Sequence, residues 1–172
     1  MTVAIREAKD DDAERLHELI LAGLEDKTSE VYRENVDKFG IPEDYVRRAF
    51  SREALMEAVA DEKQLFLVAV DDGNLVGFAQ TILQDGSTAE LDRIFLFPAH
   101  TGRGIGTQLL DKTLEILKKE GVIKLTVKAG RYEASARRFY EKNGFQIIEE
   151  VTVHAPWGRD LSLAVYELRV RG

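Results

Sequence analysis

The stretch Leu96-Phe-Pro-Ala-His-Thr-Gly-Arg-Gly-Ile-Gly-Thr-Gln-Leu-Leu110 holds the end of an apolar strand, three glycines and the start of a helix. Glycines at 102, 104 and 106 permit positive φ angles and let a ligand approach the backbone closely. The first turn of a helix leaves about four amides unpaired and carries roughly half a positive charge. Together these features predict a pyrophosphate cradle, to which the Arg103 side chain could add a contact.

Two other phosphate-binding motifs can be compared with this loop. A Walker loop ends in Gly-Lys-Ser or Gly-Lys-Thr, whereas this chain has Gly106-Thr-Gln. A dinucleotide fingerprint that begins at Gly102 needs its last glycine at the position that Thr107 occupies. Neither motif fits, and a glycine loop alone could also be only a tight turn between a strand and a helix.

The segments around the loop alternate between strands and helices. Alternating or β-branched runs predict strands, and apolar residues at helical spacing predict helices. The expected order is a strand at 2–6, helices near 10–24 and 51–61, an antiparallel meander at 64–70, 75–83 and 89–97, a helix after the glycine loop, a strand at 122–128, a helix at 134–142, and strands at 145–154 and 160–170. Residues 27–50 are polar and weakly patterned, with a helix start expected near Pro42.

The composition limits the function classes. The chain has 172 residues, of which 44% are hydrophobic and 32% charged, which indicates one domain over residues 1–172 with a full core. The absence of cysteine excludes disulfides, thiolate zinc sites and cysteine nucleophiles, and three scattered histidines argue against a metal site. Apolar runs are short and the N-terminus lacks a signal-peptide core, so we expect a soluble cytoplasmic protein with no membrane span.

Charge is unevenly distributed along the chain. The net charge of −7 argues against a general nucleic-acid binder. Residues 6–62 hold 17 acids and 9 bases, a net charge of −8, whereas residues 93–142 hold 11 bases and 5 acids, a net charge of +6. The acidic part suits a cationic partner and the basic part an anionic one, although both could be solvated helix faces.

Three segments resemble the GCN5-related N-acetyltransferase (GNAT) family. They are Asp92-Arg-Ile-Phe-Leu-Phe-Pro98, the loop and helix start at 101–110, and the segment that runs from Ala136 through Tyr140 to Gly144-Phe145. They occur in the family's order and spacing and cover about residues 64–150. The charge split and the last two strands also resemble bacterial and archaeal polyamine-type members.

The resemblance implies an α+β fold with a mixed, mostly antiparallel sheet, whose two central parallel strands splay apart between flanking helices. It implies a single acyl-CoA N-acetyltransferase domain with acetyl-CoA as cosubstrate. The backbone of residues 94–96 would pair with the pantetheine arm like an added strand, and the amides of residues 102–107 would hold the pyrophosphate. The expected cofactor-binding residues are Ile94, Phe95, Leu96, Gly102, Arg103, Gly104, Ile105, Gly106, Thr107 and Glu133.

Two positions depart from the family pattern. Thr101 stands where the family often has Gln or Arg, and Glu133 stands where it often has Asn. A carboxylate near the coenzyme A phosphates is unfavourable unless it points away or meets a cation such as Arg137. These two departures leave open how tightly the cofactor binds, whereas the expected fold does not depend on them.

Acetyl transfer to an amine needs a proton acceptor, because a free alkyl amine has a pKa of roughly 10 and attacks only when neutral. The candidates are Glu90 and Asp92, which lie two residues apart and would share one strand face. Glu90 is preferred because it is expected nearer the middle of the sheet. Either carboxylate could instead pair with Arg93 or face solvent.

A proton donor to the leaving thiolate is also needed. The resemblance implies that Tyr140 is this general acid, and an amide near Leu96 could stabilise the oxyanion. Tyr140 could instead only pack against the sheet, in which case Tyr132 and Tyr166 are weaker alternatives. The loop at 155–160 could wall the acceptor pocket or simply join two strands.

The leading interpretation is an enzyme that moves an acetyl group from acetyl-CoA to a primary amine of a small cationic acceptor, such as a polyamine, by direct attack in a ternary complex. The first alternative is an acetyltransferase for protein N-termini, which needs an open peptide groove. The second is a non-catalytic sensor that binds coenzyme A. The last strands could also add to a partner's sheet and form a homodimer.

Overall fold

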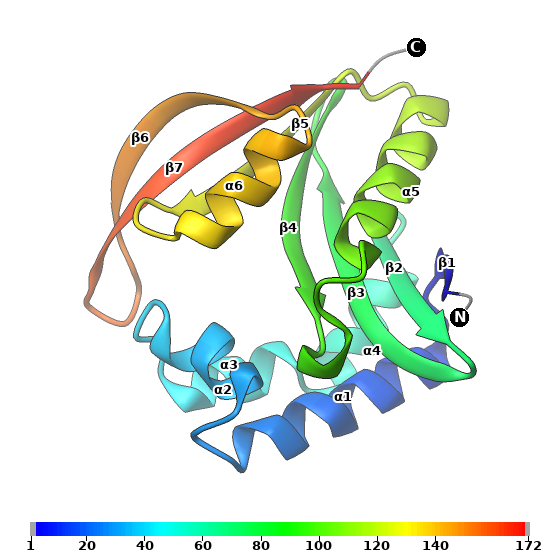
Figure 1. The fold of residues 1–172 in the computed structure, drawn as a ribbon, viewed down its shortest axis with the longest axis vertical. Coiled ribbons are helices and arrows are strands. Elements are labelled where there is room, and N and C mark those ends of the chain that lie inside the picture. Colours follow the sequence, from blue (N-terminus) through cyan, green and yellow to red (C-terminus); the bar gives the residue numbers. More distant parts are fainter. Residues whose placement is uncertain (1–2, 171–172) are drawn as a thin grey trace.

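One sheet of seven strands organises the protein, and helices lie on both of its faces (Figure 1). The computed structural model describes residues 3–170. The strands are β1 (Val3–Glu7), β2 (Gln64–Asp71), β3 (Asn74–Leu83), β4 (Thr88–Leu96), β5 (Lys124–Gly130), β6 (Gln146–His154) and β7 (Asp160–Arg169). Their spatial order is β1-β2-β3-β4-β5-β7-β6, and β4 and β5 are parallel while the other described neighbours are antiparallel. The expected α+β fold and the β2-β3-β4 meander are confirmed.

The helices form two groups on the two faces of the sheet. They are α1 (Asp10–Leu24), α2 (Glu30–Tyr32) with the π-helical turn η1 (Arg33–Asp37), α3 (Glu43–Ala49), α4 (Arg52–Ala60), the 3-10 turn η2 (Pro98–His100), α5 (Ile105–Lys119) and α6 (Ala134–Lys142). The first group, α1 to α4, packs on one face, while α5 and α6 lie on the other (Figure 1). No helix within residues 3–170 is long and apolar enough to cross a membrane.

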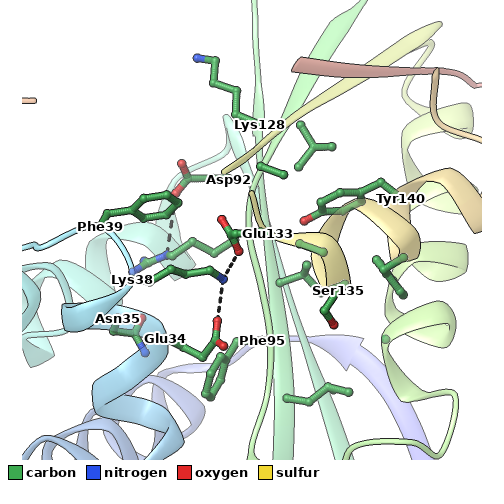
Figure 2. Close-up of a pocket in the computed structure, with 18 of the residues that line it drawn as sticks. Glu34, Asn35, Lys38, Phe39, Asp92, Phe95, Lys128, Glu133, Ser135 and Tyr140 are labelled. Atoms are coloured by element: carbon green, nitrogen blue, oxygen red, sulfur yellow. Dashed lines mark hydrogen bonds and ion pairs between the residues drawn. The ribbon is translucent and has the colours of Figure 1, made fainter. Parts of the chain in front are cut away.

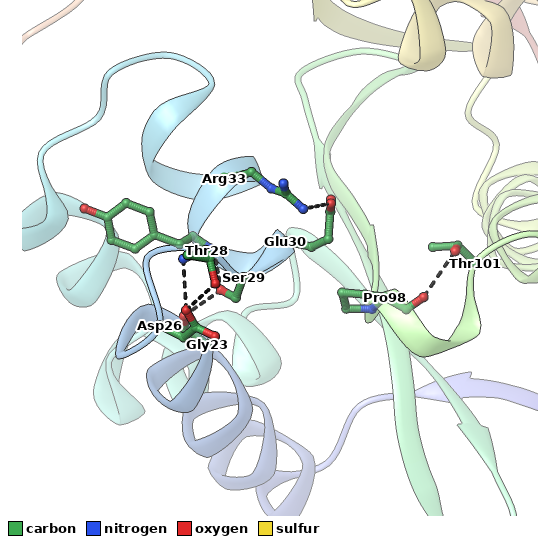
Figure 3. A network of polar contacts seen from close by, with 9 residues as sticks. Gly23, Asp26, Thr28, Ser29, Glu30, Arg33, Pro98 and Thr101 are labelled. Carbon is green, nitrogen blue, oxygen red and sulfur yellow. Dashed lines mark hydrogen bonds and ion pairs between the residues drawn. The ribbon is translucent and has the colours of Figure 1, made fainter.

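The weakly patterned segment 27–50 folds into short helices, and polar side-chain contacts fix the start of the first of them. Asp26 accepts hydrogen bonds from the amide and the hydroxyl of Thr28, at 2.9 and 2.7 Å (Figure 3). The Ser29 hydroxyl donates to the carbonyl of Gly23 at 2.7 Å and accepts from the amide of Tyr32 at 3.1 Å. Side-chain caps of this kind specify turns without hydrophobic periodicity, so the sequence pattern there is weak.

The apolar stripe expected after the glycine loop packs against the sheet. Ile105, Leu109, Leu110 and Leu117 of α5 are almost completely buried in the core cluster that also holds the inward face of β5. Their spacing follows the helical repeat, so a single face of α5 is apolar. This packing fixes the first turn of α5 at the end of β4, next to the opening described below.

The two parallel strands diverge at a bulge in β4. Residues Thr88 to Leu91 pair with Lys124 to Val127, and the pairing between β4 and β5 stops there. On the other side of β4, Gln80 pairs with Arg93 but Thr81 pairs with Leu91, so Asp92 is an extra residue. A bulge bends its strand and shifts the side-chain alternation. The expected splay is confirmed, and the simple alternation that would place Glu90 and Asp92 on one face ends at Asp92.

Candidate active site

A cavity of about 690 Å³ occupies the opening between β4 and β5 (Figure 2). Its walls come from the diverging part of β4, the end of β5, the starts of α5 and α6, and the η1 segment. The lining residues are Glu34, Asn35, Lys38, Phe39, Phe78, Asp92, Arg93, Ile94, Phe95, Leu96, Gly102, Gly106, Val127, Lys128, Ala129, Glu133, Ala134, Ser135, Ala136, Phe139 and Tyr140. The cavity therefore joins all three segments that the sequence analysis singled out.

The edge of β4 that faces the cavity offers free backbone groups. The amide of Phe97 donates to the carbonyl of Val76 on the β3 side at 3.0 Å, and successive strand residues turn their backbone groups to opposite sides. Ile94 and Leu96 therefore turn theirs toward the opening, as expected for an added strand. Phe95 differs from the expectation, because its carbonyl lies against Gly77 of β3 and only its side chain lines the cavity.

The glycine loop presents an amide cradle at one end of the cavity. Gly102 and Gly104 have φ angles of +77° and +76°, the left-handed conformation predicted for them. Within residues 3–170, the amides from Gly102 to Thr107 bond to no carbonyl or side chain, so they remain available to an anion. Gly106 has a different role: a Cβ there would lie 3.2 Å from the Phe139 ring, so the glycine lets α5 approach α6.

The polar side chains of the loop form hydrogen bonds with other residues of the protein. The Arg103 guanidinium donates to the Asp71 carboxylate at 2.9 Å and lies 3.0 Å from Nδ1 of His100. This contact anchors the side chain to the end of β2, so the predicted contact of Arg103 with phosphate would have to compete with the Asp71 carboxylate. The Thr101 hydroxyl donates to the carbonyl of Pro98 at 3.1 Å (Figure 3).

Tyr140 lies on α6 with its ring packed between Phe139 and Phe145, at centroid distances of 5.5 Å each. The residue is only 8% exposed, it lines the cavity, and its hydroxyl makes no hydrogen bond to any described residue (Figure 2). Burial, and secondarily the charge of Glu133, raises the pKa of Tyr140 to about 12. The phenol therefore stays protonated at neutral pH and can donate its proton.

The two rival tyrosines are placed differently. Tyr132 is 84% exposed, outside the main cavity. Tyr166 is buried and its hydroxyl is fully used, since it donates to Glu141 at 2.6 Å and accepts from Nε of Arg137 at 2.8 Å. Of the three, Tyr140 alone reaches the cavity.

Glu133 meets a cation that the sequence analysis missed. Its Oε1 accepts a hydrogen bond from the amide of Gly130 at 2.7 Å, and its Oε2 forms an ion pair with Lys38 rather than with Arg137 (Figure 2). Lys38 also donates to Glu34 at 2.6 Å. Burial lowers the pKa of Lys38, but its hydrogen bonds to Glu133 and Glu34 outweigh this effect and raise it.

The two candidate proton acceptors lie in different surroundings. The Glu90 carboxylate is 3.2 Å from the ammonium of Lys128 and does not line the cavity. Asp92 does line it, and burial raises the pKa of Asp92 although Arg93, 3.8 Å away, opposes the shift. The bulge thus brings Asp92, rather than the preferred Glu90, to the opening.

Arg93 is a further lining residue that sequence reasoning did not identify. Its guanidinium donates to Oε1 of Gln80 through Nε at 2.9 Å and Nη2 at 2.6 Å. It also lies 4.3 Å from the ring centre of Phe50, a cation–π contact across the α1–α4 face. These contacts hold the cation beside Asp92 in the cavity wall.

The loop between β6 and β7 supports this wall from outside. Nε1 of Trp157 donates to the carbonyl of Phe39 at 3.1 Å, and its ring meets Tyr45 edge-on at 5.8 Å. Trp157 does not line the cavity itself. Its loop therefore fixes the segment that carries Lys38 and Phe39.

The free β4 edge, the amide cradle and the phenol fit an acyl-coenzyme A: a strand-like arm, a diphosphate and a leaving thiolate. The fold and cavity define an acyl-CoA-dependent transferase. Residues 21–145 match the Acetyltransferase (GNAT) family, and the chain belongs to it. It is an N-acetyltransferase that uses acetyl-CoA as cosubstrate.

Two relatives and two solved structures illustrate the similarity. A spermidine N(1)-acetyltransferase of Thermoplasma acidophilum is 29% identical over 86% of this chain and 90% of its own length. A mycothiol acetyltransferase of Beutenbergia cavernae is 34% identical over 57% of this chain and 32% of its own. The structure of the PaiA N-acetyltransferase of Thermoplasma acidophilum in complex with coenzyme A matches with a TM-score of 0.74 and 25% identity, covering 98% of this chain and 99% of that one. The ribosomal-protein-S18-alanine N-acetyltransferase of Escherichia coli shares the fold, with a TM-score of 0.70 and 18% identity over 99% of this chain and 96% of that one.

Proposed function

We propose that the chain acetylates a primary amine of a small, multiply charged cationic acceptor such as a polyamine, by direct attack in a ternary complex. The observation that carries the proposal is that Asp92 and Tyr140 border the same cavity at the point where β4 and β5 diverge. A proton acceptor and a proton donor thus lie on two sides of one opening. The similarity to a spermidine acetyltransferase over 86% of the chain supports the cationic acceptor.

Each residue has a defined task in this reaction. Acetyl-CoA supplies the thioester carbonyl, whose carbon–sulfur bond breaks as the amine forms a carbon–nitrogen bond. Asp92 takes the proton of the incoming ammonium, directly or through water, and its raised pKa brings its basicity closer to that task. The amide of Leu96 turns toward the opening and can stabilise the oxyanion, and Tyr140 can donate a proton to the leaving thiolate.

The alternatives receive less support. An acetyltransferase for protein N-termini needs an open groove, whereas the segment with Lys38 and Phe39, fixed by Trp157, walls this cavity. A sensor without turnover needs neither a free phenol nor a carboxylate at the opening. Asp92 and Tyr140 therefore favour a catalyst.

A thiol-release assay with acetyl-CoA tests the proposal, with spermidine, spermine and short peptides as acceptors. We expect turnover of polyamines with kcat/KM at least tenfold above that of peptides. Turnover of peptides but not of polyamines would contradict the proposed acceptor. Coenzyme A binding by calorimetry without release with any acceptor would favour the sensor.

A further inference from the structure

An ammonium group of the protein itself lies inside the cavity. The Lys38 ammonium bridges Glu34 and Glu133, and all three residues line the cavity (Figure 2). The bridge joins the η1 segment to the start of α6, two segments that are far apart in the sequence. Lys38 and Glu34 belong to the least patterned part of the chain, and the sequence gives no reason for an ion-pair bridge in the cavity. The bridge therefore needs a physical explanation.

The unpartnered phenol is an independent sign that this end of the cavity receives a ligand. Tyr140 is 8% exposed, and its hydroxyl has no hydrogen-bond partner within residues 3–170 although it borders the cavity. The hydroxyl is not among the fully buried polar atoms without a partner, so it is open to the cavity and can bond to a ligand or to water that enters there. Glu133 influences Tyr140 electrostatically on one side and binds Lys38 on the other.

We propose that Glu34 and Glu133 bind an ammonium group of the acceptor, and that Lys38 occupies this position until the acceptor displaces it. This inference rests on the proposed function, because it requires a cationic acceptor. Lys38 is then a specificity-determining residue: only a molecule that brings its own ammonium group can replace it.

The charge balance of the cavity supports such an exchange. Its lining contains three carboxylates, at Glu34, Asp92 and Glu133, and three cations, at Lys38, Arg93 and Lys128. Carboxylates that are partly removed from water are costly without a counter-charge. Lys38 supplies one in the free protein, and an acceptor ammonium supplies an equivalent one when Lys38 leaves. A neutral or anionic acceptor could displace Lys38 only by leaving the two carboxylates without a counter-charge, so Lys38 would stay in place.

The test compares Lys38→Met with Lys27→Met. Both substitutions remove one positive charge and keep an unbranched side chain, but Lys27 is exposed outside the cavity. We expect Lys38→Met to lower the KM for spermidine about three- to tenfold, because no internal ammonium has to be displaced. The kcat and the KM for acetyl-CoA should stay within about twofold, and Lys27→Met should match the native enzyme.

A second variant tests the carboxylate side. Glu34→Gln should raise the KM for spermidine about three- to tenfold, because it removes one partner of the bound ammonium. Combined with Lys38→Met it should remove most of the gain. A structure of the native protein with coenzyme A and spermidine gives a check that needs no variant: an acceptor nitrogen should contact Glu133, with the Lys38 ammonium displaced.

The outcomes separate this inference from the proposed function. If native enzyme acetylates spermidine but Lys38→Met leaves its KM unchanged or raises it, the inference falls and the proposed function stands. If Lys38→Met changes chiefly the KM for acetyl-CoA, the bridge belongs to the cofactor channel and the inference is also wrong. If neither protein acetylates any polyamine, the proposed function fails and the inference fails with it.

Discussion

Tyr140 has a buried ring and a hydroxyl that reaches the cavity. Tyr140→Phe keeps the packing against Phe139 and Phe145 but removes the proton donor. We expect kcat to fall about 10²-fold or more, with little change in the KM for acetyl-CoA. Tyr166→Phe is the matched control: it loses hydrogen bonds to Glu141 and Arg137 outside the cavity, so it should lower stability while kcat changes little. A loss below threefold for Tyr140→Phe would show that the phenol is not the acid.

Asp92, the proposed proton acceptor, is a second residue whose burial should reduce the stability of the fold. Burial raises its pKa, so ionisation is less favourable in the folded protein than in the unfolded chain. Binding of a proton to Asp92 therefore stabilises the folded protein. This contribution is fully present below the pKa of the unfolded chain, near 3.8, and is lost as the pH rises through the higher pKa of the folded protein. At neutral pH the ionised carboxylate therefore destabilises the fold.

Asp92→Asn should consequently raise the melting temperature at pH 7 to 8, and the gain should shrink as the pH falls toward 4. The same variant should lose activity, because the amide cannot accept a proton. Glu90→Gln is the control: it removes the ion pair with Lys128 and a lesser effect of the Glu90 charge on the pKa of Asp92, but keeps the Asp92 carboxylate, so it should neither raise the melting temperature nor abolish activity. Thermal unfolding across this pH range decides the matter, and an Asp92→Asn protein that is less stable at pH 8 would contradict the assignment.

At the scale of elements, the contact between α5 and α6 sets the width of the cradle. Gly106 lines the cavity, and a Cβ there would already lie 3.2 Å from the Phe139 ring. Gly106→Val adds a branched side chain at this point, which should push α6 away from the first turn of α5. We expect coenzyme A affinity, measured by calorimetry, to fall at least about tenfold. Gly121→Ala, at the other end of α5 with φ +80°, should lower stability by about 1 kcal/mol but leave that affinity unchanged. Equal affinities in both variants would show that the cradle lies elsewhere.

Elements with strong local patterns could be predicted from the sequence. Helix α6 has the predicted bounds, and the meander strands differ only at their ends. The strand predicted at 122–128 begins instead at Lys124, because the amide of Val122 still bonds to the carbonyl of Leu117 and completes the end of α5. The sequence could not indicate that Asp92 lines the cavity and Glu90 does not, because the extra residue at Asp92 depends on pairing with β3, which period-two alternation cannot reveal.

The least predictable features of the site are contacts between distant segments. Lys38 reaches Glu133 from a segment whose folding depends on polar caps, and Arg93 is held by Gln80 and Phe50 on other elements. No spacing along the chain encodes such pairs. The family resemblance pointed to the part of the cavity that local motifs form, whereas the part that we propose for the acceptor is built from contacts that only the three-dimensional structure shows. The homodimer stays a prediction, for which edge strand β6 offers unpaired backbone.

At the scale of the whole molecule, the charge split follows the two faces of the sheet. The acidic residues 6–62 form α1 to α4 on one face, and the basic residues 93–142 include the glycine loop, α5 and α6 on the other (Figure 1). The cavity opens between them at the diverging strands. An anionic cofactor and a cationic acceptor can thus approach from differently charged sides and meet in one complex.

Direct transfer in that complex predicts a particular kinetic pattern. An acyl-enzyme would need a nucleophile beside a base, yet the chain has no cysteine, and Ser135, which lines the cavity, has no side-chain hydrogen bond to a base within residues 3–170. Initial rates measured against both substrates should therefore give intersecting lines, and coenzyme A should compete with acetyl-CoA but not with the amine. Raising the salt concentration from 0.05 to 0.5 M should raise the KM for spermidine more than that for a monoamine, because screening weakens each additional charge contact. Parallel lines, together with acetylated protein isolated in the absence of acceptor, would instead establish a covalent intermediate and remove the basis for a ternary complex.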